Sequence, residues 1–319
     1  MKRPAALVLT AGLGTRLRPL TDVRAKAAVP VNGDPLARRV AFWLASRGFD
    51  NQVYNLHHHP ATITACLGDG SELGIRIRYS WEQPVLGSAG GPRRALPLLM
   101  DGGGTRFLIV NGDTLTNVDV DGLLSWHAES GALVTMAVIP NPAPERYGGV
   151  SVTNRAFVSG FTRPGADRES YHFIGVQVAE AKAFDSLVDG IPHESVNALY
   201  PMLMHRNRES VAAFVSQAGF RDIGTPADLF ETSISLIPEE GNRLVSTGAQ
   251  IADDAVVERT ALWDDVIVER GARLVDCIVA DRVRISAGMS LARCAIVPAG
   301  SRSPVDDERV ENGLLIRPF

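Results

Sequence analysis

The segment Leu9–Lys26 contains the residue types that proteins use to bind a polyphosphate. It carries the glycines Gly12 and Gly14, followed by the cations Arg16, Arg18 and Lys26. Glycine lets a loop bring bare backbone N–H groups close to a ligand, while arginine and lysine place fixed positive charge beside phosphate oxygens. The preceding apolar run, Ala5–Leu9, predicts a buried strand. We therefore expect a phosphate-binding loop at the carboxyl end of a strand in an α/β sheet.

Two carboxylates follow other predicted strand ends. The apolar run Phe107–Val110 leads to Asp113, and Asp222 precedes Gly224 in the stretch FRDIGTPADL. Taken singly, Asp113 could cap a helix and Asp222 could start a turn. If both lie at the same sheet edge as the glycine-rich loop, as we expect, they suggest a Mg²⁺ site, because Mg²⁺ takes a few hard oxygens and lets phosphates complete its shell.

Composition excludes several function classes. The chain has 319 residues, is 45% hydrophobic, and has a net charge of −4, so no surplus of positive charge favours nucleic acid or a membrane surface. No apolar stretch approaches the roughly 20 residues needed to cross a bilayer. Three cysteines without metal or disulfide spacing suit a reducing cytoplasm, where we expect the protein to act.

Up to about residue 237, strand-like runs alternate with amphipathic helical stretches such as Leu36–Arg47 and Val120–Ser130. This alternation predicts an α/β domain over residues 1–237, with a Rossmann-like, mostly parallel sheet flanked by helices. The polar stretch Pro238–Asn242 is interpreted as a linker to a second domain.

Residues 243–319 contain an internal repeat of 17 residues. Matching positions carry similar side chains, as in the sets Ile251, Val268, Ile285; Val257, Leu274, Leu291; Thr260, Cys277, Cys294; and Leu262, Val279, Ile296. Apolar positions recur about every six residues, which is typical of a three-sided parallel β-helix. In that fold Cys277 and Cys294 are small core residues.

These motifs resemble those of the sugar-1-phosphate nucleotidyltransferases, also called NDP-sugar pyrophosphorylases. AGLGTRLRPLT matches the signature of that family, and Lys26 stands where the family has its Pro-Lys-Pro lysine. The other matching motifs follow in the family's order, namely LGSAGG (Leu86–Gly91), VNGD (Val110–Asp113), YGGV (Tyr147–Val150) and DIGTPADL (Asp222–Leu229). The resemblance covers nearly the whole chain and includes a short C-terminal left-handed β-helix.

The resemblance implies transfer of a nucleoside monophosphate from an NTP to a sugar 1-phosphate, with release of pyrophosphate. Arg16 would hold the β- and γ-phosphates, and Lys26 would bridge the α-phosphate and the attacking sugar phosphate. Asp113 and Asp222 would share Mg²⁺, the cofactor. The implied nucleotide-binding residues are Ala11, Gly12, Leu13, Gly14, Thr15, Glu82, Gln83, Gly87 and Ser88. The implied sugar-phosphate-binding residues are Asn111, Gly148, Thr162, Arg163 and Gly175.

The base and the sugar stay open. Glu82 as a carboxylate could accept from the two donors of guanine's pairing edge, whereas Gln83 could serve uracil or thymine. The chain also departs from the family's pattern at three places, with Ala25-Lys26-Ala27 for Pro-Lys-Pro, Thr162-Arg163 for Glu-Lys, and Phe220 for a tryptophan. The loss of the glutamate at Thr162 removes an expected contact to sugar hydroxyls.

Our first expectation is guanylyl transfer from GTP to mannose 1-phosphate. The alternatives are a glucose-1-phosphate thymidylyl- or uridylyltransferase, an N-acetylmuramate-1-phosphate uridylyltransferase, and a regulatory paralogue that binds nucleotide sugars without turnover. We expect the β-helix to pack on the catalytic domain or on a partner subunit, which allows a homo-oligomer through either domain. No nucleic-acid or membrane partner is expected.

Overall fold

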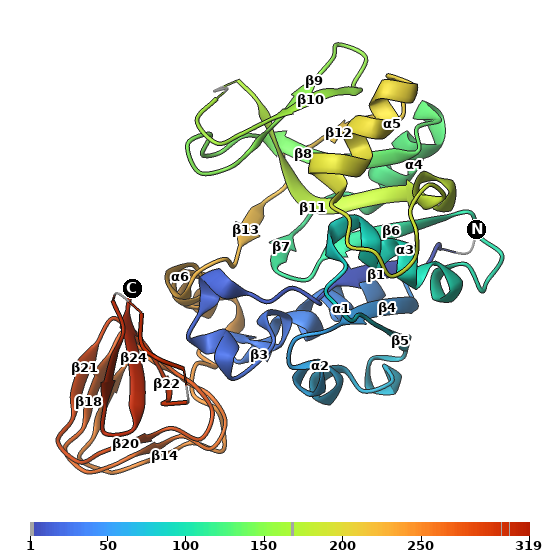
Figure 1. The fold of residues 1–319 in the computed structure, drawn as a ribbon. Coiled ribbons are helices and arrows are strands. Elements are labelled where there is room, and N and C mark those ends of the chain that lie inside the picture. The colour runs from blue at the N-terminus through green and yellow to red at the C-terminus, as the bar shows by residue number, and fades with distance from the viewer. Residues whose placement is uncertain (1–2, 167–168, 301, 306) are drawn as a thin grey trace. The chain divides into compact units, whose positions relative to one another are not determined.

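The structure is a computed structural model that describes residues 3–166, 169–300, 302–305 and 307–319 (Figure 1). The chain forms two compact units. The first unit contains Met1–Gly12, Val40–Pro60 and Leu67–Arg221, and the second contains Leu13–Arg39, Ala61–Cys66 and Asp222–Phe319. The segment that follows the first strand therefore belongs to the same compact unit as the C-terminal repeat.

The first unit is built on a nine-stranded sheet. Its strands are β1 (Ala6–Leu9), β4 (Asn51–Leu56), β5 (Arg76–Trp81), β6 (Arg106–Asn111), β8 (Val134–Pro140), β9 (Gly149–Val152), β10 (Val158–Thr162), β11 (Tyr171–Glu180) and β12 (Val211–Val215). The order is β10-β9-β11-β6-β1-β4-β5, and β8 pairs with both β11 and β12. The expected α/β sheet is confirmed.

The sheet is mixed because one long strand runs against its neighbours. β1 pairs in parallel with β4 and β6, and β8 pairs in parallel with β12. β11 is antiparallel to both β6 and β8. Among the residues described between β8 and β11 none is helical. The chain there forms the antiparallel pair β9–β10, so it returns without the crossover that a parallel neighbour needs.

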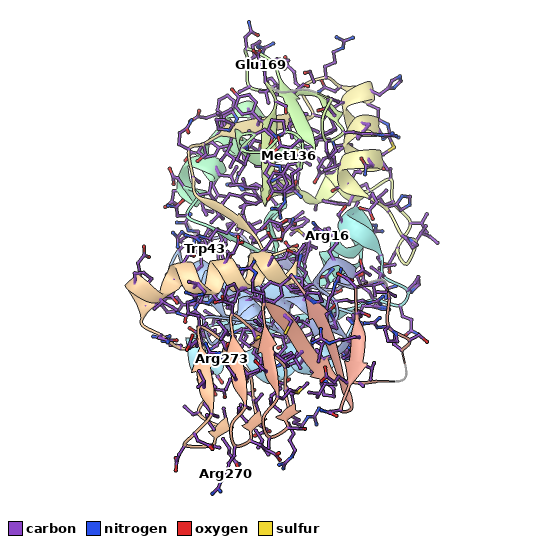
Figure 2. All side chains as sticks on the ribbon, turned by 90° about the vertical axis from the view of Figure 1, so that its left-hand side faces the viewer. Arg16, Trp43, Met136, Glu169, Arg270 and Arg273 are labelled. Atoms are coloured by element: carbon purple, nitrogen blue, oxygen red, sulfur yellow. The ribbon has the colours of Figure 1, made fainter. Side chains whose placement is uncertain are left out.

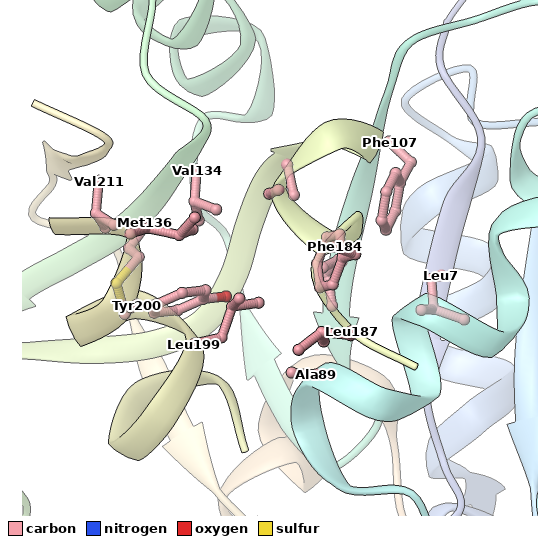
Figure 3. Packing of buried hydrophobic residues seen from close by; sticks show 14 of the residues in the cluster. Leu7, Ala89, Phe107, Val134, Met136, Phe184, Leu187, Leu199, Tyr200 and Val211 are labelled. Carbon is pink, nitrogen blue, oxygen red and sulfur yellow. The ribbon is translucent and has the colours of Figure 1, made fainter. Parts of the chain in front are cut away.

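The strand before the glycine-rich loop lies deep inside this sheet. β1 has β6 on one side and β4 on the other, and Ala6, Leu7 and Val8 are fully buried. An apolar run of this kind is expected for a strand covered on both faces. Leu7 belongs to the main core, where the rings of Phe107 and Phe184 pack with their centroids 5.7 Å apart (Figure 3).

The helices are α1 (Leu36–Ala45), α2 (Pro60–Leu67), α3 (Gly87–Leu99), α4 (Val120–Ser130), α5 (Tyr200–Arg206) and α6 (Pro226–Glu240). None of the helices in the described ranges is long and apolar enough to cross a membrane. The interpretation of Pro238–Asn242 as a linker is wrong in part, because α6 continues through Glu240. Pro238 lies in the last turn of α6, and Gly241 ends the helix by donating its N–H to the carbonyl of Ile237, 2.9 Å away.

The repeat folds as a three-sided parallel β-helix, as predicted (Figure 1). Its coil strands are β14 (Gln250–Ile251), β15 (Val256–Glu258), β16 (Ala261–Leu262), β17 (Ile267–Val268), β18 (Arg273–Val275), β19 (Ile278–Val279), β20 (Arg284–Ile285), β21 (Ser290–Ala292) and β22 (Cys294–Pro298). The 17-residue spacing is the observed register, since Ile251 pairs with Val268 and Val268 with Ile285. Apolar side chains fill the interior, while Arg270 and Arg273 lie exposed on its outside (Figure 2).

The last coil is closed by strands that run the other way. β24 (Leu314–Pro318) pairs antiparallel with β22, and β23 (Arg309–Glu311) pairs antiparallel with β24. These two strands extend only the face formed by β16, β19 and β22. Inside the coils the Sγ atoms of Cys277 and Cys294 lie 3.7 Å apart as buried thiols.

Candidate active site

The glycine-rich loop belongs to the second unit from Leu13 onward and folds as three short 3₁₀ turns, Thr15–Leu17, Leu20–Asp22 and Lys26–Ala28. Gly14 precedes the first turn with φ = +62°, a left-handed conformation that favours glycine. A Cβ at Gly14 would lie 2.8 Å from Thr21 Cγ2 and 3.1 Å from Lys26 Cβ. The hydroxyl of Thr21 donates to the Gly14 carbonyl at 2.9 Å. Gly14 thus allows the loop to fold tightly against Lys26.

Arg16 and Asp222, predicted from separate motifs, meet in this unit. Arg16 Nη1 lies 3.9 Å from Asp222 Oδ2, and the Arg16 side chain is 64% exposed. A Cβ at Gly224 would lie 3.0 Å from Arg16 Nη1, so glycine leaves room for the guanidinium. The structure therefore brings together Gly14, Arg16, Lys26 and Asp222 on one unit.

The motif GTPAD explains how the Asp222 segment is held. Thr225 caps α6 by accepting from the Asp228 N–H at 3.2 Å, and Asp228 Oδ2 accepts from the Thr225 N–H at 2.9 Å. Pro226 occupies the first helical position. Asp222 itself ends β13 (Phe220–Asp222), which lies in a separate two-stranded sheet. The expectation that Asp222 lies at the edge of the main sheet is therefore wrong.

In the first unit, the side chain of Asn55 holds the backbone that follows β1. Its Oδ1 accepts from the N–H of Thr10 at 2.6 Å and of Ala11 at 3.3 Å. The Asn55 amide donates to Glu82 Oε1 at 2.7 Å, and Glu82 Oε2 accepts from the Leu86 N–H at 2.8 Å. This chain of hydrogen bonds connects Ala11, the start of the glycine-rich loop, to the LGSAGG motif.

The predicted direct contact between Glu82 and a nucleobase needs correction. Glu82 is only 3% exposed, and both of its carboxylate oxygens accept hydrogen bonds from the protein. A Cβ at Gly91 would lie 2.6 Å from Glu82 Oε1, so α3 packs directly on this carboxylate. Its neighbour Gln83 is exposed. Sequence reasoning missed Asn55, whose only signal was a polar residue inside a buried strand.

Ser88 and Gly87 begin α3 against another carboxylate. Ser88 Oγ donates to Glu194 Oε2 at 2.7 Å and accepts from the Ser195 N–H at 2.8 Å. Gly87 has φ = +75°, and a Cβ there would lie 2.6 Å from Glu194 Oε1. The Ser88 hydroxyl thus fixes the start of α3.

Asn111 and Asp113 leave the carboxyl end of β6 as predicted. Asp113 lies between β6 and the short strand β7 (Thr114–Thr116), and its Oδ1 accepts from the Thr114 hydroxyl at 3.4 Å. A Cβ at Gly175, where φ is +76°, would lie 2.9 Å from Asn111 Cβ. Glycine in β11 therefore permits close approach to Asn111, and these two predicted sugar-site residues are neighbours.

The other predicted sugar-site residues, Gly148, Thr162 and Arg163, line one cavity of about 710 Å³. The cavity also has Asn197 and His172 on its wall, neither of which sequence reasoning identified. His172 packs against Tyr147 and Phe220, with ring centroids 4.4 and 4.8 Å away. Burial lowers the pKa of His172, so the imidazole is neutral at pH 7. Thr162 Oγ1 and His172 Nδ1 are buried and have no hydrogen-bond partner among the described residues.

The two carboxylates predicted to bind a metal, Asp113 and Asp222, lie on different segments of the chain. Among the described residues, no group of three or more histidine, cysteine or acidic side chains could hold a metal ion by itself. Asp113 and Asp222 are hard oxygen donors of the kind Mg²⁺ takes one or two at a time, with phosphates supplying further ligands.

Comparison with known proteins agrees with these motifs. Residues 5–237 match the family model described as nucleotidyl transferase. The chain is 28% identical over 300 residues to the mannose-1-phosphate guanylyltransferase of Mycobacterium tuberculosis, covering 90% of this chain and 83% of that protein. It is 34% identical over 230 residues to the N-acetylmuramate alpha-1-phosphate uridylyltransferase of Neisseria meningitidis, covering 71% and 95%.

Solved structures show the same fold. HddC from Yersinia pseudotuberculosis superposes with a TM-score of 0.62 at 19% identity, covering 73% of this chain and 99% of that one. The family model spans most of the chain and includes the loop of Gly14, Arg16 and Lys26 as well as Asp113 and Asp222. The chain therefore belongs to the nucleotidyl transferase family of enzymes, and the resemblance noted from its motifs is confirmed.

Proposed function

We propose that the protein transfers GMP from GTP to mannose 1-phosphate, giving GDP-mannose and pyrophosphate. The observation that carries this proposal is the assembly of Gly14, Arg16, Lys26 and Asp222 on one unit. The choice of substrates is supported by the relative from Mycobacterium tuberculosis, which aligns with this chain through the β-helix as well as the catalytic region.

The electrostatic problem of the reaction is that two polyanions must approach each other. Arg16, which is largely exposed, binds the β- and γ-phosphates and stays with the leaving pyrophosphate. Lys26 lies between the α-phosphate and the attacking sugar phosphate and stabilises the charge that develops there. The attacking phosphate oxygen is already ionised at neutral pH, so no general base is needed.

We propose that Asp113 and Asp222 are the protein's ligands for Mg²⁺. When bound, Mg²⁺ neutralises phosphate charge and polarises the phosphoryl group under attack. Replacing Asp113 with asparagine keeps the shape of the side chain and removes its charge. Asp113→Asn is expected to abolish Mg²⁺-dependent turnover while the thermal unfolding curve stays unchanged, and a near-normal rate would remove Asp113 from the metal site.

The cavity bounded by Gly148, Thr162 and Arg163 is the proposed sugar-phosphate site. The volume of the cavity suits a sugar phosphate. The guanidinium of Arg163 can donate two hydrogen bonds to a phosphate group. Thr162 Oγ1 and His172 Nδ1, buried at the wall of this cavity, have no hydrogen-bond partner among the described residues, and we propose that sugar hydroxyls supply one. Asn111 of β6 and Gly175 of β11 complete the proposed set of sugar-phosphate-binding residues.

For the nucleotide, we propose that Ala11, Gly12, Leu13, Gly14 and Thr15 supply backbone contacts. Gly12, Leu13 and Thr15 are exposed, and nothing lies within 4 Å of a Cβ built on Gly12. Glu82 contributes indirectly by holding Leu86 and, through Asn55, Ala11. Gln83, which is exposed, and the Gly87-Ser88 backbone remain the proposed direct contacts to the base.

Uridylyl transfer to N-acetylmuramate 1-phosphate is the second candidate, favoured by the 34% identity to the Neisseria enzyme. Pyrophosphate release measured with each of five NTPs against mannose, glucose and N-acetylmuramate 1-phosphates separates the candidates. GTP with mannose 1-phosphate should give the highest kcat/KM. Binding of nucleotide sugars without release of pyrophosphate in any pair would identify a regulatory paralogue instead.

We also propose that the enzyme works in the cytoplasm, where a reducing environment keeps thiols unpaired. Cys66, Cys277 and Cys294 are all free. A homo-oligomer formed through either the β-helix or the catalytic region is proposed as well, and the mass of the protein in solution tests it directly.

A further inference from the structure

The β-helix binds the segment just before Lys26 through contacts to Arg24. Arg24 donates from Nε to Asp281 Oδ2 at 2.6 Å and from Nη2 to Asp281 Oδ1 at 2.5 Å. Its Nη2 also donates to Asp264 Oδ2 at 2.7 Å. The guanidinium carbon lies 5.3 Å from the centre of the Trp263 ring, so the cation also stacks on an aromatic face. Arg24 is 13% exposed and Asp281 15%, which makes this a largely desolvated ion pair.

The repeat itself creates the binding site for Arg24. Asp264 and Asp281 are 17 residues apart, so they occupy equivalent positions on consecutive coils. The Asp264 N–H also donates to Asp281 Oδ1 at 3.2 Å. Two stacked carboxylates repel each other unless a cation lies between them. Burial alone would lower the pKa of Arg24, but hydrogen bonds and the charge of Asp281, and then of Asp264, raise it.

Two further contacts hold the same segment. Arg302 Nε donates to Asp22 Oδ2 at 3.0 Å, and Arg302 forms a bidentate pair with Glu308 at 2.7 and 2.9 Å. Arg317, on β24, donates to the Arg18 carbonyl at 2.8 Å. The stretch Arg18–Arg24 is therefore bound to the C-terminal domain at three points, all within the second unit.

We propose that the β-helix is a positioning element for the reaction and that Arg24 is its main contact residue. Arg24 is two residues before Lys26, and the intervening Ala25 N–H donates to Thr62 Oγ1 of α2 at 3.1 Å. With both Arg24 and Ala25 held, the backbone that carries Lys26 has little freedom to move. The proposal rests on the proposed role of Lys26, because Arg24 itself faces the β-helix and acts through that lysine.

A matched control exists inside the same β-helix. Arg259 forms a bidentate pair with Asp276, with both N–O distances at 2.7 Å, but this pair joins neighbouring coils and does not involve the glycine-rich segment. Asp281→Asn and Asp276→Asn each remove the carboxylate charge from a bidentate pair with an arginine. They differ in whether the partner arginine belongs to the segment that leads to Lys26.

Steady-state kinetics on the full-length enzyme tests the proposal. Asp281→Asn should lower kcat at least tenfold while KM for the NTP changes less than threefold, because the affected group is Lys26 and not Arg16. Arg24→Lys keeps the positive charge but loses the guanidinium that donates two hydrogen bonds to Asp281, and it should give an intermediate kcat. Asp276→Asn should match the wild type in both constants. Equal kinetics for Asp281→Asn and Asp276→Asn would overturn the proposal.

Trypsin cleavage provides a readout independent of turnover. Cleavage after Arg24 and Lys26 should be faster in Asp281→Asn than in Asp276→Asn when the two unfold at similar temperatures. Unchanged cleavage would contradict the proposed anchoring. Asp264→Asn, at a carboxylate that is 64% exposed, serves as a milder variant should Asp281→Asn fold poorly, and a wild-type kcat together with wild-type cleavage would likewise overturn the proposal.

Lys26→Ala distinguishes failure of this inference from failure of the proposed function. A Lys26→Ala enzyme with normal kcat removes Lys26 from the chemistry and the proposed mechanism with it. A strong loss in Lys26→Ala together with normal behaviour of Asp281→Asn leaves the mechanism intact and rejects only the role of the β-helix.

Discussion

Arg16 Nη1 lies 3.9 Å from Asp222 Oδ2, close enough to interact but too far for a hydrogen bond. Arg16 is 64% exposed and Asp222 13%, and an ion pair with one exposed partner at this distance contributes little to folding. Arg16 therefore lies near the carboxylate of Asp222 without a hydrogen bond to it. Such a residue can leave its protein partner and bind a phosphate.

Arg16→Ala is expected to separate stability from activity. The free energy of unfolding should change by less than about 0.5 kcal/mol, because Arg16 is exposed and lies beyond hydrogen-bond distance of Asp222. The kcat/KM for the NTP should fall about 10²- to 10³-fold, as is typical when a group that stabilises developing charge is removed. Arg16→Lys should recover part of the loss, and near-normal kcat/KM in Arg16→Ala would exclude the proposed role.

Gly14→Ala should disturb the loop locally. Its φ of +62° strains any residue with a Cβ, and that Cβ would lie 2.8 Å from Thr21 Cγ2. We expect KM for the NTP to rise at least tenfold, measured by initial rates, because the loop must shift away from Lys26. Gly104→Ala is the control, since its new Cβ would meet no atom closer than 3.8 Å. Unchanged KM in Gly14→Ala would show that the loop geometry is not needed for nucleotide binding.

Glu82→Gln should destabilise the first unit. Both carboxylate oxygens accept hydrogen bonds, and a glutamine would present an N–H₂ to one of the two donors, Asn55 or the Leu86 N–H. A buried unsatisfied donor costs about 1–3 kcal/mol, which urea denaturation can measure. The exposed neighbour provides the control, and Gln83→Glu should stay within about 0.5 kcal/mol of the wild type. A Glu82→Gln protein as stable as that control would contradict the role assigned to this carboxylate.

Glu240 should contribute a pH-dependent part of the stability. Hydrogen bonds from Arg39, at 2.8 and 2.7 Å, lower the pKa of Glu240 below its ordinary value, and Asn32 donates a further bond. The unfolded chain therefore binds a proton more readily than the folded one. This stabilisation is fully present above the unfolded pKa of about 4.3 and is lost as pH falls through the folded pKa.

Denaturation curves from pH 7 to pH 3 test this expectation. Glu240→Gln should be less stable than the wild type at pH 7, and the difference should shrink below about pH 4 as the wild-type carboxylate protonates. Glu239→Gln, at the adjacent exposed position, should run parallel to the wild type throughout. A constant gap between Glu240→Gln and the wild type over the whole range would rule out the linkage.

The sequence was sufficient to predict features that depend on local pattern. The 17-residue spacing gave the register of the β-helix, because stacked coils repeat the same environment at Ile251, Val268 and Ile285. The glycine-rich loop around Gly14 was also predicted, since glycine conformation is decided by near neighbours.

Features that depend on distant partners could not be predicted. Glu82 was expected to contact the nucleobase, and only the folded structure shows that Asn55 and Leu86 donate hydrogen bonds to both of its carboxylate oxygens. The same holds for Arg24, which sequence reasoning did not single out. Its partners Asp264 and Asp281 are 240 and 257 residues away in the sequence, beyond the reach of any local pattern.

The antiparallel closure of the last coil limits how this protein can have changed in length during evolution. Repeat arrays grow by duplication of a unit, and a new parallel coil must pair with a free strand on every face. Here β24 occupies the outer edge of β22, so a coil added after β22 would find one of its three faces taken. Growth is therefore restricted to coils inserted before the final one, and each such insertion would move Arg317 by one coil away from the Arg18 carbonyl that it now contacts.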